Sequence, residues 1–220
     1  MAAPKITLYL DVVSPFAYMA FHVLRHSPTF ANCNVTYVPI FLGGLMKACG
    51  NNPPINIKNK DLWIGKERQR WAKYFSIPMS DRMPEGFPPM TLAAQRALCA
   101  ISIKAPDSLV PAVDAFYRSI WVDGNAKIAQ PEGFMPVLES LLGKDKAQEI
   151  LAAANQPEVK SLVSSNTDRA FKSGAFGLPW FECTNSKGET EGFWGIDHLG
   201  QAADFLGLDR SSDKGFRAML

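Results

Sequence analysis

The chain has 220 residues, of which 47% are hydrophobic, so it can bury a full core as one domain or as a compact domain with an insertion. Its formal net charge of +2 comes from interspersed basic and acidic residues. This pattern argues against nucleic acid and against a membrane surface, and it leaves a small molecule as the expected partner. No apolar run approaches the roughly 18 residues that a membrane-spanning helix needs.

The four cysteines indicate a reducing, intracellular setting. Cys33, Cys49, Cys99 and Cys183 are far apart and form no metal-type pair with the three histidines, so we expect free thiols and no metal site. We expect the cytoplasm, with the mitochondrion and the peroxisome as alternatives. The C-terminus, Ala218-Met219-Leu220, is similar to a peroxisomal address but lacks its basic penultimate residue.

The first part of the chain predicts a strand, a helix and a second strand. Apolar residues 6–10 predict the first strand, Pro15 to about Arg25 a helix with one buried face, and residues 35–38 the second strand. A strand, a crossover helix and another strand form a parallel pair with a right-handed connection.

Ser14-Pro15-Phe16-Ala17 stands at the start of this helix, where thioredoxin-like proteins carry their redox-active Cys-x-x-Cys. The free N–H groups and the dipole of a helix N-terminus favour negative charge, so this is a seat for a thiolate. A serine cannot be oxidised to a disulfide, but its hydroxyl can donate a hydrogen bond to a thiolate that a ligand brings. We therefore expect glutathione as the ligand. Taken alone, such a serine is more often a simple helix cap.

The rest of the chain predicts a helical insertion followed by a hairpin and a helix. Apolar residues recur at helical spacing from about 65 to 172, and residues 180–183 and 190–194 predict a β-hairpin around Asn185-Ser186-Lys187-Gly188. Asp197 is expected to cap a last helix that runs to about Leu206. The predicted fold class is therefore α/β: a thioredoxin-like domain of residues 1–64 and 173–220, interrupted by an all-α insertion of residues 65–172.

Three further segments would complete a glutathione site. Gly174-Ala175-Phe176-Gly177-Leu178-Pro179 stands where thioredoxin-like proteins place a cis-proline, which would turn the main chain of Leu178 toward an extended peptide. Gly50-Asn51-Asn52-Pro53-Pro54, with Lys60 beyond it, is a polar loop whose commoner role is a surface turn. Asp197 can receive the γ-glutamyl ammonium group of glutathione and also cap the last helix.

Four motifs in this order resemble the kappa-class glutathione transferases nearly end to end: Asp11-Val12-Val13-Ser14-Pro15-Phe16, residues 50–54, residues 174–179 and Trp194-Gly195-Ile196-Asp197. This family also contains 2-hydroxychromene-2-carboxylate isomerase and is similar to the DsbA oxidoreductases, whose insertion is also helical. The resemblance implies a homodimeric detoxification enzyme that uses glutathione as co-substrate, with Ser14 as the catalytic residue that stabilises the thiolate. It also implies glutathione contacts from Ser14, Pro15, Phe16, Asn51, Lys60, Leu178, Pro179, Ile196 and Asp197.

The chain departs from the family pattern at two positions of the last motif. Kappa enzymes usually show Ser-Asp-Arg where this chain has Ile196-Asp197-His198. A hydroxyl is therefore missing beside the γ-glutamyl site, and a titratable group replaces a fixed cation. We expect glutathione affinity to be weaker or to depend on pH.

The electrophile is expected in a pocket between the first helix and the helical insertion. The wall residues proposed for it are Phe16, Trp63, Met90 and Trp121, each of which is more often plain core. Two readings compete with a transferase that conjugates or reduces small electrophiles: an isomerase of the chromene-carboxylate type, which adds and expels glutathione, and a non-enzymatic glutathione-binding module. A dithiol oxidoreductase is strongly disfavoured because both thiols of the active motif are absent.

Overall fold

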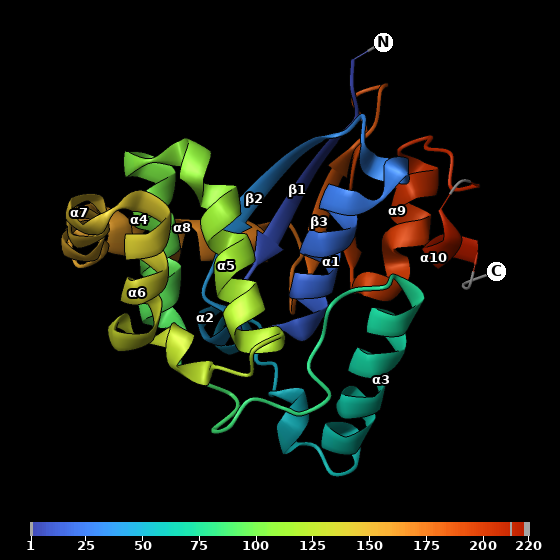
Figure 1. The fold of residues 1–220 in the computed structure, drawn as a ribbon. Helices are drawn as coiled ribbons and strands as arrows, with labels where there is room; N and C mark the ends of the chain where they lie inside the picture. The colour runs from blue at the N-terminus through green and yellow to red at the C-terminus, as the bar shows by residue number, and fades with distance from the viewer. Residues whose placement is uncertain (1, 212, 218–220) are drawn as a thin grey trace.

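The computed structural model describes residues 2–211 and 213–217. A four-stranded sheet in the order β2-β1-β3-β4 forms its centre (Figure 1). The strands are β1 (Lys5–Leu10), β2 (Asn34–Pro39), β3 (Trp180–Thr184) and β4 (Thr190–Trp194). β1 pairs with β2 in parallel and with β3 antiparallel, and β3 and β4 form a hairpin. The predicted α/β fold, its parallel pair and its hairpin are confirmed.

Ten α-helices occur in the described residues: α1 (Pro15–His26), α2 (Leu42–Ala48), α3 (Lys60–Tyr74), α4 (Leu92–Lys104), α5 (Leu109–Trp121), α6 (Pro131–Leu142), α7 (Lys144–Ala154), α8 (Pro157–Lys172), α9 (Leu199–Phe205) and α10 (Lys214–Arg217). Short 3-10 helices are at Pro28–Phe30, Pro54–Asn56, Pro106–Ser108, Ala126–Ala129 and Ile196–His198. The part of the chain that the structure describes contains no helix long and apolar enough to cross a membrane.

Helices cover both faces of the sheet because successive side chains of a strand point to opposite sides. On one face, Phe21 of α1 lies on Tyr37 of β2, and Phe205 of α9 lies on Phe193 of β4. On the other face, the Arg169 guanidinium of α8 lies over the ring of Tyr9 in β1. Helices thus lie on both faces, and α1 begins just beyond the carboxyl end of the central strand β1.

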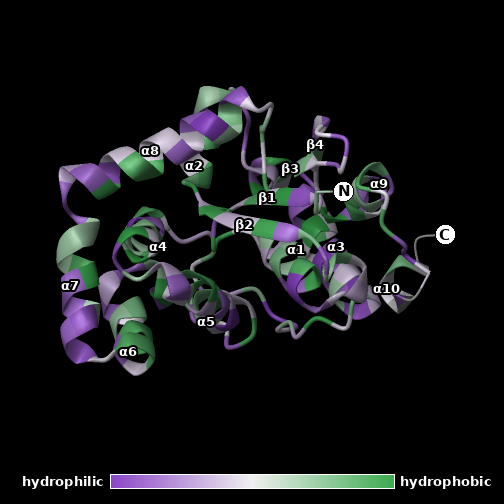
Figure 2. Ribbon diagram, turned by 90° about the horizontal axis from the view of Figure 1, so that it is seen from above, coloured by the Kyte–Doolittle hydropathy of each residue, from purple (hydrophilic) through white to green (hydrophobic). Residues whose placement is uncertain are grey.

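The helices α3 to α8, which follow α2 and precede β3, divide into two groups. α4 to α8 gather at one side of the sheet, with hydrophilic residues along the outer stretches of α7 and α8 (Figure 2). α3 instead packs near α1, away from that group (Figure 1). The boundary proposed between residues 64 and 65 falls inside α3. The C-terminal residues 218–220, considered above as a peroxisomal address, lie outside the described residues.

Candidate functional site

Ser14 caps α1 at the carboxyl end of β1. Its Oγ accepts a hydrogen bond from the N–H of Ala17 at 3.1 Å, and Pro15 occupies the first helical turn, where its missing N–H costs nothing. Ser14 is 6% exposed, and its hydroxyl lies at the N-terminus of α1, close to the free N–H groups of the first helical turn. The geometry therefore combines a hydroxyl with the positive end of the helix dipole.

The loop before β3 faces Ser14. The Leu178–Pro179 peptide bond is cis, as the sequence predicts. The main-chain oxygen of Leu178 lies 3.5 Å from Ser14 Oγ, and the oxygen of Pro179 accepts a hydrogen bond from Gly195 N–H at 3.0 Å. The fold thus brings Ser14, Leu178 and Pro179 together, although they lie on opposite sides of the helical insertion in the sequence.

Asn51 joins this group through the same loop. Its Nδ2 donates a hydrogen bond to the oxygen of Phe176 at 2.8 Å, while its main-chain N–H donates to Met46 near the end of α2. Lys60 is exposed at the first position of α3. Asn51 therefore lies beside the cis-proline loop, whereas the Lys60 ammonium group extends from a separate element.

Ile196, Asp197 and His198 form a 3-10 turn between β4 and α9. The expectation that Asp197 caps the last helix is wrong: His198 holds the cap position of α9, and no side chain caps it. The Asp197 side chain, 54% exposed, instead lies with Oδ1 3.3 Å from His198 Nδ1. Ile196 is buried. Asp197 is thus free of a capping role and open to solvent.

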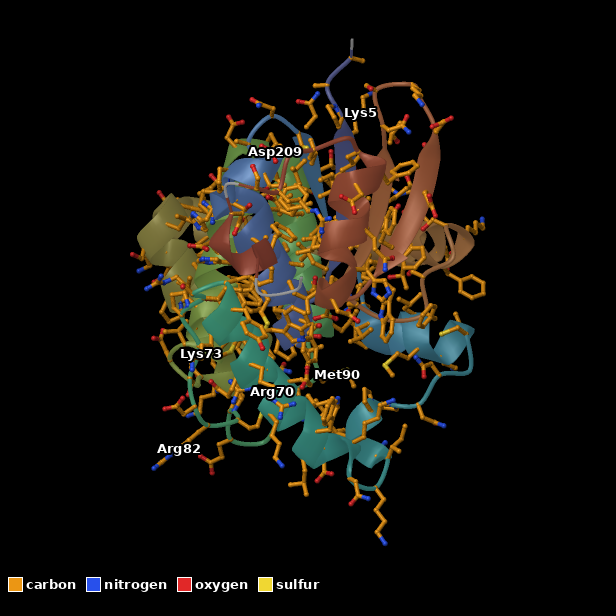
Figure 3. The ribbon with its side chains drawn as sticks, turned by 90° about the vertical axis from the view of Figure 1, so that its right-hand side faces the viewer. Lys5, Arg70, Lys73, Arg82, Met90 and Asp209 are labelled. Carbon is orange, nitrogen blue, oxygen red and sulfur yellow. The ribbon has the colours of Figure 1, made fainter. Side chains whose placement is uncertain are left out.

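The residues proposed as walls of the electrophile pocket have different surroundings. Phe16 is partly buried, whereas Trp63 and Met90 are 54% and 64% exposed. Figure 3 labels Met90 near α3. Trp121 is 0% exposed, so it cannot line an open pocket in this structure. Its indole Nε1 donates to the oxygen of Val12 at 2.9 Å, because the turn before Ser14 rests directly on α5. Trp121 is therefore a core residue that supports this turn.

The sequence predicts no role for Asp11 or for Tyr117. The Tyr117 hydroxyl donates to the main-chain oxygen of Asp11 at 3.3 Å, and the N–H of Ser14 donates to the same oxygen at 3.0 Å. The Asp11 side chain is fully buried, and burial raises its pKa to about 6 against the hydrogen bonds that it accepts. A carboxylate that directly follows an apolar strand is the sequence signal by which this residue could have been found.

The four cysteines are free. Cys99 and Cys183 are buried, and burial raises the pKa of each thiol to about 12. Cys49 is partly exposed, with Sγ 3.7 Å from the oxygen of Phe176. Among the residues that the structure describes, no group of three or more His, Cys, Asp or Glu side chains could hold a metal ion.

Comparisons with known proteins match this architecture over nearly the whole chain. The family model of the DSBA-like thioredoxin domain matches residues 5–207. The glutathione S-transferase kappa 1 of Rattus norvegicus is 30% identical over 93% of this chain and 92% of its own length. The 2-hydroxychromene-2-carboxylate isomerase of Sphingobium xenophagum is 26% identical over 91% of this chain and 95% of its own. A solved structure of 2-hydroxychromene-2-carboxylate isomerase superposes with a TM-score of 0.75 at 21% identity, covering 92% of this chain and 94% of that one.

Proposed function

The chain belongs to the DSBA-like thioredoxin family and, within it, to the group of the kappa glutathione S-transferases, and from this premise we propose that it activates the thiol of glutathione for transfer to small electrophiles. The observation that carries the proposal is the position of Ser14. A hydroxyl, and no protein thiol, caps α1 opposite the cis-proline loop. The nucleophilic sulfur must therefore come from a ligand.

The proposed chemistry is ionisation of a bound thiol. A cysteine-type thiol has a pKa of about 8.5, so only a few per cent of it is ionised at neutral pH. The N-terminus of α1 and a hydrogen bond donated by the Ser14 hydroxyl both favour the thiolate. Lowering the thiol pKa by one to two units would make the thiolate the main species near pH 7. The thiol proton leaves to solvent, and the thiolate then attacks the electrophile; with an aryl halide, the new carbon–sulfur bond replaces the carbon–halogen bond and halide is released.

The Ser14 hydroxyl is well prepared for this role. Its oxygen lone pair is engaged by Ala17 N–H, whereas its hydrogen faces the Leu178 oxygen at 3.5 Å, the outer limit of a hydrogen bond. The hydrogen can therefore turn to a thiolate at little cost. We propose that the cysteinyl unit of glutathione pairs with the main chain of Leu178, which places its sulfur beside Ser14.

The remaining glutathione contacts are proposed from the surrounding elements. Asn51 lies beside the cis-proline loop and Lys60 begins α3, and both would bind polar groups of the peptide. Asp197 would accept the γ-glutamyl ammonium group, because its carboxylate is exposed and makes no helix cap. Pro15, Phe16, Pro179 and Ile196 would provide the apolar lining.

An isomerase is the second candidate, because two of the reported matches are 2-hydroxychromene-2-carboxylate isomerases. Such an enzyme would use the same thiolate but expel glutathione unchanged. The experiment that separates the candidates measures glutathione consumption with aryl halides and peroxides, and conversion of a chromene carboxylate at constant glutathione. Consumption of glutathione supports the transferase, and conversion without consumption supports the isomerase. Binding of glutathione with no reaction in either assay would indicate a non-enzymatic binding module.

A further inference from the structure

We propose that Asp11 is a positioning residue of the glutathione site, whose carboxylate connects the turn that carries Ser14 to the helix that leads to Asn51. The inference rests on the proposed function for its consequence, but its geometry stands on the contacts of Asp11 alone. Asp11 is 0% exposed and lies at the carboxyl end of the central strand β1. Its side chain cannot touch a ligand and acts only through its neighbours.

The carboxylate accepts hydrogen bonds on both oxygens. Oδ1 accepts from Val13 N–H at 3.2 Å and from Gln95 Nε2 at 2.9 Å, and Oδ2 accepts from Leu42 N–H at 2.9 Å. Val13 directly precedes Ser14, and Leu42 is the first residue of α2. A single buried group therefore fixes the turn before α1 and the start of α2 relative to each other.

These contacts continue to the opposite side of the site. α2 ends at Ala48, and Asn51 is held to it by its N–H bond to the oxygen of Met46 at 2.9 Å. The Asn51 side chain then donates to Phe176, two residues before Leu178, whose oxygen faces Ser14. The contacts thus form a closed chain from Asp11 through α2, Asn51 and the cis-proline loop back to Ser14. A shift at Asp11 would move two of the proposed glutathione contacts together.

The hydrogen bonds around Asp11 fit an ionised carboxylate, although burial by itself favours the neutral acid. Val13, Gln95 and Leu42 all present donors, and a carboxylate can accept from all three. Gln95 directs its amide nitrogen at Asp11, while its own Oε1 is buried without a hydrogen-bond partner among the described residues. A protonated Asp11, or an asparagine in its place, would present one hydrogen-bond donor of its own to these neighbours. Gln95 could rotate so that its Oε1 accepts from that donor, but the N–H of Val13, next to Ser14, would then lose its acceptor.

The surroundings of the carboxylate determine at which pH this change occurs. Burial raises the pKa of Asp11 to about 6, while Leu42 N–H, the Thr91 hydroxyl, Val13 N–H and Gln95 lower it. The groups from the start of α2 and from α4 that hydrogen-bond to the Asp11 carboxylate are thus uncharged. On α5, Tyr117 is titratable, but burial and Asp11 raise its pKa well above its usual value, so it stays neutral. Asp11 is therefore half ionised near pH 6, so its positioning effect is nearly complete above about pH 7 and is lost as the pH falls below about 5.

Calorimetric binding of S-methylglutathione tests the proposal, because this analogue has no thiol to ionise. The measurements run from pH 5 to pH 8 in a His198→Arg background, which removes the nearby histidine as a source of pH dependence. We expect the affinity to fall about tenfold from pH 8 to pH 5, as for the loss of one hydrogen bond to a charged group. When Asp11→Asn is added to this background, the affinity should equal the pH 5 value of the background protein at every pH. Unchanged affinity and pH dependence in Asp11→Asn would overturn the proposal.

Asp114→Asn is the matched control, since it makes the same chemical change at a partly exposed pair with Arg25 on α1 and α5, outside the closed chain of contacts. It should keep the affinity and pH dependence of the background protein. If it loses both as Asp11→Asn does, the effect is not specific to Asp11 and the proposal fails.

A second measurement needs neither ligand nor variant. In nuclear magnetic resonance spectra of the parent protein, the amide signals of Val13 and Leu42 should shift together with a midpoint near pH 6. Amide signals that do not change between pH 5 and pH 7.5 would overturn the proposal even if Asp11→Asn cannot be folded. If the Val13 and Leu42 signals shift as expected but S-methylglutathione does not bind at any pH, the result would instead contradict the proposed glutathione function.

Discussion

The hydroxyl oxygen of Ser14 lies 3.5 Å from the main-chain oxygen of Leu178, a residue 164 positions later in the chain. Ser14 comes from the first turn of α1, and Leu178 comes from the loop that enters β3. Since β1 and β3 are neighbours in the sheet, their shared edge brings the two residues together. A thiol bound beside the Ser14 hydroxyl would therefore also lie beside the main chain of Leu178.

Ser14→Ala should reduce kcat/KM about 5- to 150-fold, because it removes a hydrogen bond to a charged group worth about 1–3 kcal/mol. The pKa of the bound glutathione thiol should rise, which ultraviolet titration of the thiolate detects. Binding should change less than turnover, since the main chain of Leu178 is intact.

The same variant also loses the cap on Ala17 N–H, which costs about 1 kcal/mol of folding stability. Urea denaturation measures that loss separately, and Ser165→Ala in α8 is a matched control, because its hydroxyl bonds only within the helix. An unchanged thiol pKa with an unchanged rate in Ser14→Ala would exclude Ser14 from the mechanism.

Activity should not depend on a protein thiol. The raised pKa values of Cys99 and Cys183, about 12, keep both thiols neutral at physiological pH, and both are buried. A variant that replaces all four cysteines and still folds should retain conjugating activity. Cys49→Ser is the informative single change, because Cys49 lies next to Phe176. Loss of turnover with intact glutathione binding would support a thiol redox enzyme instead.

Asp197→Ala should weaken glutathione binding by about 1–2 kcal/mol. The carboxylate is 54% exposed, so its attraction for an ammonium group is screened more than that of a buried charge. Stability should hardly change, since Asp197 caps no helix. Full affinity in this variant would show that the γ-glutamyl group binds elsewhere.

Affinity for glutathione should also respond to His198. His198 stands where kappa enzymes usually have arginine, so His198→Arg places a fixed cation next to Asp197. Calorimetric titration at pH 8 should therefore show tighter glutathione binding in His198→Arg than in the parent. Equal affinity of the two proteins would contradict this role.

Asp11→Asn should change how folding stability depends on pH. Burial raises the pKa of Asp11 from 3.8 to about 6, so the folded protein holds this proton more tightly than the unfolded chain. Stability contributed by Asp11 is therefore greatest below pH 4 and falls as the pH rises through about 6, by about 3 kcal/mol in total. The variant lacks this loss. Urea denaturation from pH 4 to pH 7 should show its stability rising relative to the parent; parallel pH profiles would contradict the assignment.

A homodimer is expected from the family resemblance, and a two-fold interface would be self-complementary. Light scattering at micromolar concentration should then give about twice the chain mass of 24.2 kDa. A fully active protein with the mass of one chain would show that no part of the site depends on a partner subunit.

The sequence predicted the fold and the main-chain part of the site because short-range signals determine both. Pro15 after Ser14 marks a helix start, and the hairpin follows from two apolar runs around an Asn-Ser-Lys-Gly turn. Pro179 supplied the signal for the cis bond. These features depend on residues within a few positions of one another.

Features that depend on distant packing were not predicted correctly. Trp121 was one of the candidate residues for the pocket wall, but it is fully buried and its indole N–H donates to the oxygen of Val12. Aspartate is a residue type that often caps helices. Gly195, however, leads into the 3-10 turn Ile196–His198, and this turn moves the cap position of α9 by one residue, from Asp197 to His198. Asp11 went unassigned because its partners, Leu42 and Gln95, are distant in sequence.

The central position of β1 has a consequence for how the protein is made. β1 and β2 are synthesised early, but β3 follows only after the whole helical segment from α3 to α8, so β1 pairs on its second side late in synthesis. Closing so long a loop is costly in chain entropy and slows non-local pairing. Until then, the apolar residues of β1 must be shielded by α1 and β2 alone. A truncated chain ending before Leu178 would therefore lack both the completion of the sheet and the main-chain partner proposed for the cysteinyl unit of glutathione.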